Sequence, residues 1–150
     1  MNIKMRQLII ARKDLQMSPG KLAAQCCHAS IAFLTRPIEE SVYGTYYKDS
    51  PQILYSVDAD IYKNWICGIF TKTICEAKNR NQLLKAVALA EKLGLKENKD
   101  FFLIKDACLT ELEPEEVDEN GVGRVLTCIG FKPMADEVIQ KISKKFQLYK

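Results

Sequence analysis

Stretches of apolar residues alternate along this chain with amphipathic stretches of helical spacing. The continuous apolar stretches are typical of buried strands and predict strands at residues 4–12, 68–77, 101–106 and 123–129. The helical spacing predicts helices at residues 19–34, 79–93 and from Pro133 onward, with a short helix at residues 58–65. This order predicts an α/β fold, in which a four-stranded, largely parallel but mixed sheet lies in a three-layer α/β/α arrangement.

The two later helices have clear apolar stripes. One is formed by Leu83, Leu84, Val87 and Ala90, and the other by Met134, Val138, Ile142 and Phe146. Residues 37–55 form a long connection rich in Tyr and Ser, which predicts either an ordered excursion or a mobile flap. The acidic stretch at residues 113–121 predicts a loop. With no internal repeat or linker composition, residues 1–150 are expected to form one domain.

Composition narrows the class of protein. Hydrophobic residues make up 47% of the 150 residues and charged residues 27%, as in globular proteins. No apolar run reaches the ~20 residues that span a bilayer, and the N-terminus does not resemble a signal peptide. We therefore expect a cytoplasmic protein that does not interact with membranes. A net charge of +3 is compatible with a nucleic-acid partner but does not argue for one.

Six cysteines and a single histidine raise the question of a metal or disulfide site. There is no C-x-x-C pair, so the spacing of zinc sites is missing. Most of the cysteines lie in apolar runs, and we expect them to be buried, reduced thiols.

The start of the helix at residue 19 is the first candidate site. Ser18 is a good N-cap and Pro19 suits the first helical position. Lys21 adds a cation where the helix dipole is already positive, so we expect an anion such as phosphate to bind here. Spacing by four and then three places Lys21, Gln25 and His28 on one face, although an ordinary exposed helix face would give the same spacing.

Asp106 is the second candidate, because it ends an apolar strand. If the strands at residues 4–12 and 101–106 run in parallel, Asp106 and the start of the first helix lie at one edge of the sheet, where open α/β sheets bind ligands. An aspartate that merely begins a turn is the alternative. The chain has no Gly-x-Ser-x-Gly elbow, Walker loop or Gly-x-Gly-x-x-Gly motif, which argues against a serine nucleophile or nucleotide hydrolysis.

Residues 12–29 resemble the opening motif of the peptidyl-tRNA hydrolase family of archaeal and eukaryotic type, in which a strand precedes Asp-Leu-x-Met-x-x-Gly-Lys and Ala-Ala-Gln-Cys-x-His-Ala. Further matches are Trp65, Cys67 and Gly68, residues 93–95, Asp106, Ala107 and Thr110, Ile129 and Gly130, and residues 146–149. The resemblance implies hydrolysis of the ester between peptide and tRNA by a homodimer that needs no metal or organic cofactor. It assigns catalysis to Lys21, Asp106 and Thr110 and a supporting role to Gln25 and His28. We further expect Arg12, Ser18 and Gly20 to bind the substrate.

The chain also departs from the family pattern. Cys108 and Leu109 replace a usual glycine and basic residue, and Val125 stands where a threonine is common. Thr127, two residues on, shares the face of Val125 but is not the matching position. Two alternative functions therefore stay open: a non-catalytic module that binds RNA or protein, and a thiol or metal protein.

Overall fold

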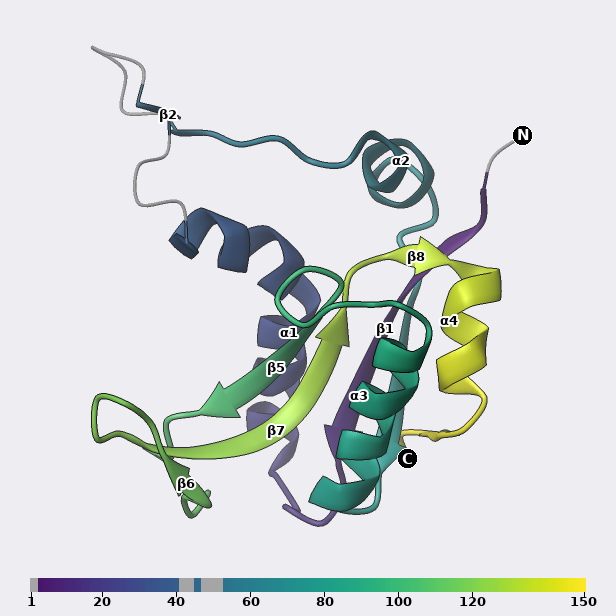
Figure 1. Ribbon diagram of the computed structural model, residues 1–150. Helices are drawn as coiled ribbons and strands as arrows, with labels where there is room; N and C mark the ends of the chain where they lie inside the picture. The colour runs from purple at the N-terminus through teal and green to yellow at the C-terminus, as the bar shows by residue number, and fades with distance from the viewer. Residues whose placement is uncertain (1–2, 41–44, 47–52) are drawn as a thin grey trace.

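One mixed β-sheet organises the described part of the computed structural model, residues 3–40, 45–46 and 53–150 (Figure 1). Its strands follow the order β5-β7-β1-β4-β9, with β6 paired to β7 and β8 paired to β1. The strands are β1 (Met5–Arg12), β4 (Lys72–Ala77), β5 (Phe101–Asp106), β6 (Glu116–Val117), β7 (Gly123–Phe131), β8 (Met134–Ala135) and β9 (Gln147–Leu148). A separate two-stranded sheet pairs β2 (Thr45–Tyr46) with β3 (Ile53–Leu54).

The α/β class is confirmed, but the prediction of a four-stranded, largely parallel sheet is wrong. The sheet has seven strands, and only β1 and β4 form a parallel pair among those described. The three additional strands, β6, β8 and β9, have two residues each. Such short strands carry no alternation of apolar and polar residues, so the sequence pattern does not reveal them.

The strand directions decide where the candidate residues meet. β7 is antiparallel to both β1 and β5, and it lies between them. β1 and β5 therefore run in the same direction, and their last residues, Arg12 and Asp106, lie at the same edge of the sheet. The chain enters the first helix, α1 (Pro19–Glu40), from this edge. The strands that contain Arg12 and Asp106 thus run in the same direction, as was required to bring Asp106 near this helix.

Helices cover the sheet from both sides (Figure 1). Small residues of α1, among them Ala29 and Ala32, pack with Ile9 and Cys128. This contact is close: a Cβ atom on Gly130 would lie 2.1 Å from the carbonyl oxygen of Ala29, so only glycine fits there. On the other face, α3 (Arg80–Lys92) and α4 (Asp136–Ser143) pack with the alternate β1 residues, Leu8 and Ile10. None of the helices in the described ranges is long and apolar enough to cross a membrane.

Two predicted helix boundaries are wrong. α1 does not end at residue 34 but continues through Pro37 to Glu40. Inside a helix, proline lacks a backbone donor and its ring crowds the carbonyl four residues earlier, which is why the sequence suggests an end before Pro37. In the structure Arg36 ties this last turn to β5 by donating to the carbonyl of Leu103 over 3.1 Å, a tertiary contact that supports the longer helix. The last helix begins at Asp136 rather than Pro133, because the intervening Met134 pairs with β1 in strand β8.

Other predictions hold in part. The helix expected at residues 58–65 is a turn of α-helix, α2 (Ala59–Ile61), followed by a π-helix, η1 (Tyr62–Ile66). The acidic stretch expected to be a loop contains β6. The nature of the 37–55 connection stays a prediction, since residues 41–44 and 47–52 lie outside the described residues.

Candidate active site

Lys21 and Asp106 meet at the edge of the sheet where α1 begins. Ser18 caps the helix, with its Oγ accepting the backbone N–H of Lys21 over 3.3 Å. One turn of helix then directs the Lys21 side chain to Asp106, with Nζ 3.0 Å from each carboxylate oxygen. The same ammonium donates to Thr110 Oγ1 over 3.2 Å. Of the three residues predicted to be catalytic, Lys21 therefore contacts both of the others.

The carboxylate of Asp106 accepts further hydrogen bonds from the protein. Gln25 Nε2 donates to Oδ1 and the backbone N–H of Cys108 to Oδ2, each over 3.0 Å. Burial alone would raise the pKa of Asp106, but the hydrogen bonds from Lys21, Cys108 and Gln25, with the charge of Lys21, hold it below its usual value. Asp106 is thus ionised at neutral pH, and most of its lone pairs are already occupied by donors.

Thr127 is part of this network, although the sequence analysis did not assign it a role. It is fully buried, and its Oγ1 lies 2.7 Å from Gln25 Oε1 and 3.2 Å from the carbonyl of Ile104. Since a hydroxyl can donate to the Gln25 oxygen, this contact orients the amide so that its nitrogen faces Asp106. The position of the family threonine, Val125, is buried in an apolar cluster instead.

A second unpredicted residue, Glu111, ties the Thr110 loop to the start of α1. Its carboxylate accepts the backbone N–H of Ser18 over 3.0 Å and also the Ser18 hydroxyl. Ser18 thus holds the loop in place, while Gly20 is exposed in the first turn of the helix. His28 is exposed farther along α1 and its side chain makes no hydrogen bond to any described residue, so its supporting role stays a prediction.

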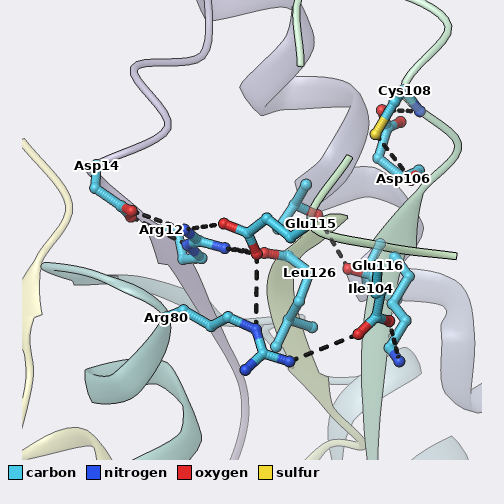
Figure 2. Close-up of polar contacts among 11 residues, drawn as sticks. Arg12, Asp14, Arg80, Ile104, Asp106, Cys108, Glu115, Glu116 and Leu126 are labelled. Carbon is cyan, nitrogen blue, oxygen red and sulfur yellow. Dashed lines mark hydrogen bonds and ion pairs between the residues drawn. The ribbon is translucent and has the colours of Figure 1, made fainter. Parts of the chain in front are cut away.

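Arg12 lies in a separate ion-pair cluster (Figure 2). Only 3% of the residue is exposed, and its guanidinium group donates to Asp14, to Glu115 and to the carbonyl of Leu126 over 2.7–3.1 Å. Arg80 extends the cluster, with its Nε 3.6 Å from Glu115. The structure therefore gives Arg12 partners within the protein, and its predicted contact with substrate stays untested.

The described residues contain no group of three or more His, Cys, Asp or Glu side chains arranged to hold a metal ion. All six cysteines are described and all are free. The expectation of burial holds for Cys26, Cys75 and Cys128. It is wrong for Cys27 and Cys67, which are exposed, and for Cys108, which is half-buried. Burial raises the pKa of Cys108, the thiol next to the site, and the charge of Asp106 raises it further, which disfavours a thiolate nucleophile.

This arrangement is suited to chemistry that develops negative charge. A lysine ammonium and the first amides of a helix can both stabilise an anion, and the carboxylate and threonine hydroxyl beside them can orient a small polar molecule such as water. At this end of the sheet, 12% of the Lys21 side chain and 13% of the Asp106 side chain remain exposed.

Comparison with known proteins agrees with this description. The family described as Peptidyl-tRNA hydrolase PTH2 matches residues 5–149. The chain is 32% identical to a peptidyl-tRNA hydrolase of Methanopyrus kandleri, covering 92% of each chain, and 32% identical to that of Haloquadratum walsbyi, covering 97% of this chain and 100% of the relative. It is 30% identical to the mouse mitochondrial peptidyl-tRNA hydrolase 2, covering 96% of this chain and 63% of the relative. This chain belongs to the PTH2 family of peptidyl-tRNA hydrolases.

Proposed function

We propose that this protein hydrolyses the ester bond between peptide and tRNA in peptidyl-tRNA and so frees the tRNA for reuse. The observation that carries the proposal is the contact of Lys21 with both Asp106 and Thr110 at the start of α1. Membership of the family supports it, since the relatives are peptidyl-tRNA hydrolases.

In this reaction a water molecule attacks the carbonyl carbon of the ester and forms a tetrahedral intermediate with an oxyanion. The bond to the ribose oxygen then breaks, the ribose oxygen takes up a proton, and the peptide leaves as a carboxylate. Lys21 is the group best placed to stabilise the oxyanion, because its ammonium lies at the positive end of α1. In the exposed first turn, the backbone N–H of Gly20 is proposed to bind a phosphate at the 3′ end of the tRNA, next to Ser18, whose own N–H is taken by Glu111.

Asp106 is proposed to orient the attacking water and to accept its proton. In the free protein its oxygens are occupied, so the substrate must draw Lys21 toward itself before a water molecule can reach the carboxylate. Thr110 then helps to position either the water or the ribose hydroxyl. Gln25, held by Thr127, keeps the carboxylate in place during this exchange.

The wider setting is also part of the proposal. We propose that residues 1–150 act as one peptidyl-tRNA hydrolase domain with a three-layer α/β/α arrangement, and that the protein acts as a homodimer in the cytoplasm without a metal or organic cofactor. Binding of tRNA should be mainly electrostatic and weaken steeply with added salt.

The test is hydrolysis of peptidyl-tRNA by the wild-type protein and by Lys21→Ala and Asp106→Ala. Removing one well-placed electrostatic group typically costs ~3 kcal/mol, so each variant should lose about a hundredfold or more in kcat. Lys92→Ala, on α3 at the opposite face, is the matched control and should retain activity. Hydrolysis within a few-fold of wild type in both site variants would refute the assignment. A wild-type protein that binds tRNA but releases no peptide would favour the non-catalytic alternative.

A further inference from the structure

A groove of about 1020 Å³ opens beside the proposed catalytic residues. One wall is α1 from Gln25 to Glu40, and the other is formed by the end of β5, by β6 and by Arg124 of β7. Asp106 and Gln25 line one end of it. We propose that this groove binds the peptide part of peptidyl-tRNA. This inference rests on the proposed function and adds where the peptide lies and which peptides the site prefers.

The length of the groove suits a short extended peptide. From Gln25 to Glu40, α1 advances ~22 Å at about 1.5 Å per residue. An extended chain rises about 3.3 Å per residue, so roughly six residues cover that distance. Because the groove is continuous with Asp106, a peptide whose ester lies at the catalytic residues can follow it directly.

The walls offer contacts for both the side chains and the backbone of a peptide. Ile31 of α1 and Val117 of β6 both line the groove, and they are 49% and 69% exposed. β5 ends the path of paired strands, but Arg36 donates to the outward-facing carbonyl of Leu103, and the groove is lined by β5 only from Ile104 to Asp106. At this end of β5, where no strand partner lies among the described residues, the backbone can offer a peptide a hydrogen bond.

The charge of the groove disfavours RNA as its occupant. Five carboxylates line it, against three cationic side chains: Glu39, Glu40, Asp106, Glu116 and Asp118, with Arg36, Lys105 and Arg124. Glu116 is paired with Lys105 and Asp118 with Arg124. Glu39 and Glu40 are exposed and form no ion pair with any described residue. The end of the groove at Glu39 and Glu40 would therefore repel a polyanion such as RNA and attract a peptide with lysine side chains.

The experiment compares three substrates on one tRNA with the same C-terminal residue: an N-acetylaminoacyl ester, an N-acetylated hexapeptide rich in lysine, and one rich in glutamate. For the wild type we expect kcat/KM to favour the lysine peptide over the glutamate peptide by a factor of about two to five per contacted charge, as exposed ion pairs supply. The variant Glu39→Gln/Glu40→Gln should reduce this preference and leave the short ester within twofold of wild type.

Two controls separate the possible outcomes. Glu91→Gln/Glu137→Gln makes the same change of charge on α3 and α4 and should keep the wild-type preference. Val117→Ser should lower kcat/KM for both hexapeptides but not for the short ester. Equal rates for the two hexapeptides in the wild type would overturn the proposal. An equal rise in kcat/KM for all three substrates in Glu39→Gln/Glu40→Gln would also overturn it, because it would place RNA in the groove. Hydrolysis of the short ester tests the proposed function separately.

Discussion

Replacing Thr127 by valine removes one buried hydroxyl while nearly preserving the shape of the side chain. The hydroxyl lies 2.7 Å from Gln25 Oε1, and Gln25 Nε2 lies 3.0 Å from Asp106. Without its partner, the buried amide oxygen is unsatisfied, at a cost of about 1–3 kcal/mol. Gln25 can reduce that cost by turning away from Asp106. The hydrogen bond to the carboxylate is worth about 1.5–3 kcal/mol, so losing even the lower amount should reduce kcat about tenfold.

The assay is steady-state hydrolysis of peptidyl-tRNA by four proteins: wild type, Thr127→Val, Gln25→Ala and the double variant. If Thr127 acts through Gln25, the valine substitution should have little further effect once Gln25 is alanine. KM should change less than kcat, because Thr127 is buried and does not reach the substrate. Thr127→Ser keeps the hydroxyl and should restore most of the activity.

Wild-type kcat in Thr127→Val would refute this reasoning. The same fold loss from Thr127→Val in the Gln25→Ala background would also refute it, because it would indicate an effect on folding rather than on Gln25. Urea unfolding of each variant separates the two effects, and we expect Thr127→Val to lower the free energy of unfolding by about 1–3 kcal/mol.

Two further predictions concern charged residues away from the catalytic contacts. Arg12→Lys cannot reproduce the forked contacts with Asp14 and Glu115, so the free energy of unfolding in urea should fall by about 1–3 kcal/mol. Arg12→Gln removes the charge and should leave the salt dependence of tRNA binding unchanged, whereas a slope smaller by about one would show a direct phosphate contact. Asp100 has its pKa held below its usual value because, although burial opposes it, Lys132 and a backbone N–H donate to the carboxylate. In the unfolded chain the Asp100 carboxylate has its ordinary pKa of about 3.9, so it binds a proton at a higher pH than in the folded protein. Acid therefore favours the unfolded chain, and the free energy of unfolding should fall as the pH drops below about 3.9. Asp100→Asn should be less stable than wild type at pH 7, and its free energy of unfolding in urea should depend less on pH between pH 2 and 5. If the free energy of unfolding changed equally with pH in both proteins, the lowered pKa of Asp100 would not be the cause of the acid effect.

The elements predicted well are those whose pattern extends over several turns or strand residues. The predicted bounds of β5, residues 101–106, are those observed, and α3 begins and ends within one residue of the predicted helix. β9 was missed because Gln147 and Leu148 form a strand only through pairing with β4, which no local pattern records. Likewise, the length of α1 depends on Arg36 reaching β5, a contact made by tertiary structure.

The candidate site was predictable for residues whose type is unusual at the start of a helix or the end of a strand. A lysine in the first turn of a helix and an aspartate ending a strand are both visible in the sequence, and the parallel direction of β1 and β5 brings them together. The role of Thr127 was not visible, because it depends on the register of β7 against β5 and on the rotation of α1. The partners of Arg12 were equally hidden, since Glu115 is 103 positions away in the chain.

The contacts that build the site join residues 81 to 102 positions apart, in the first helix, in β5 and in β7. A nascent chain whose β7 is still inside the ribosome lacks Thr127, which holds Gln25 in place. A nascent chain without β5 lacks the carboxylate of Asp106 altogether. Loss of hydrolysis during denaturation should therefore coincide with global unfolding, so that enzyme activity becomes a direct reporter of whether the last third of the chain has been synthesised and folded.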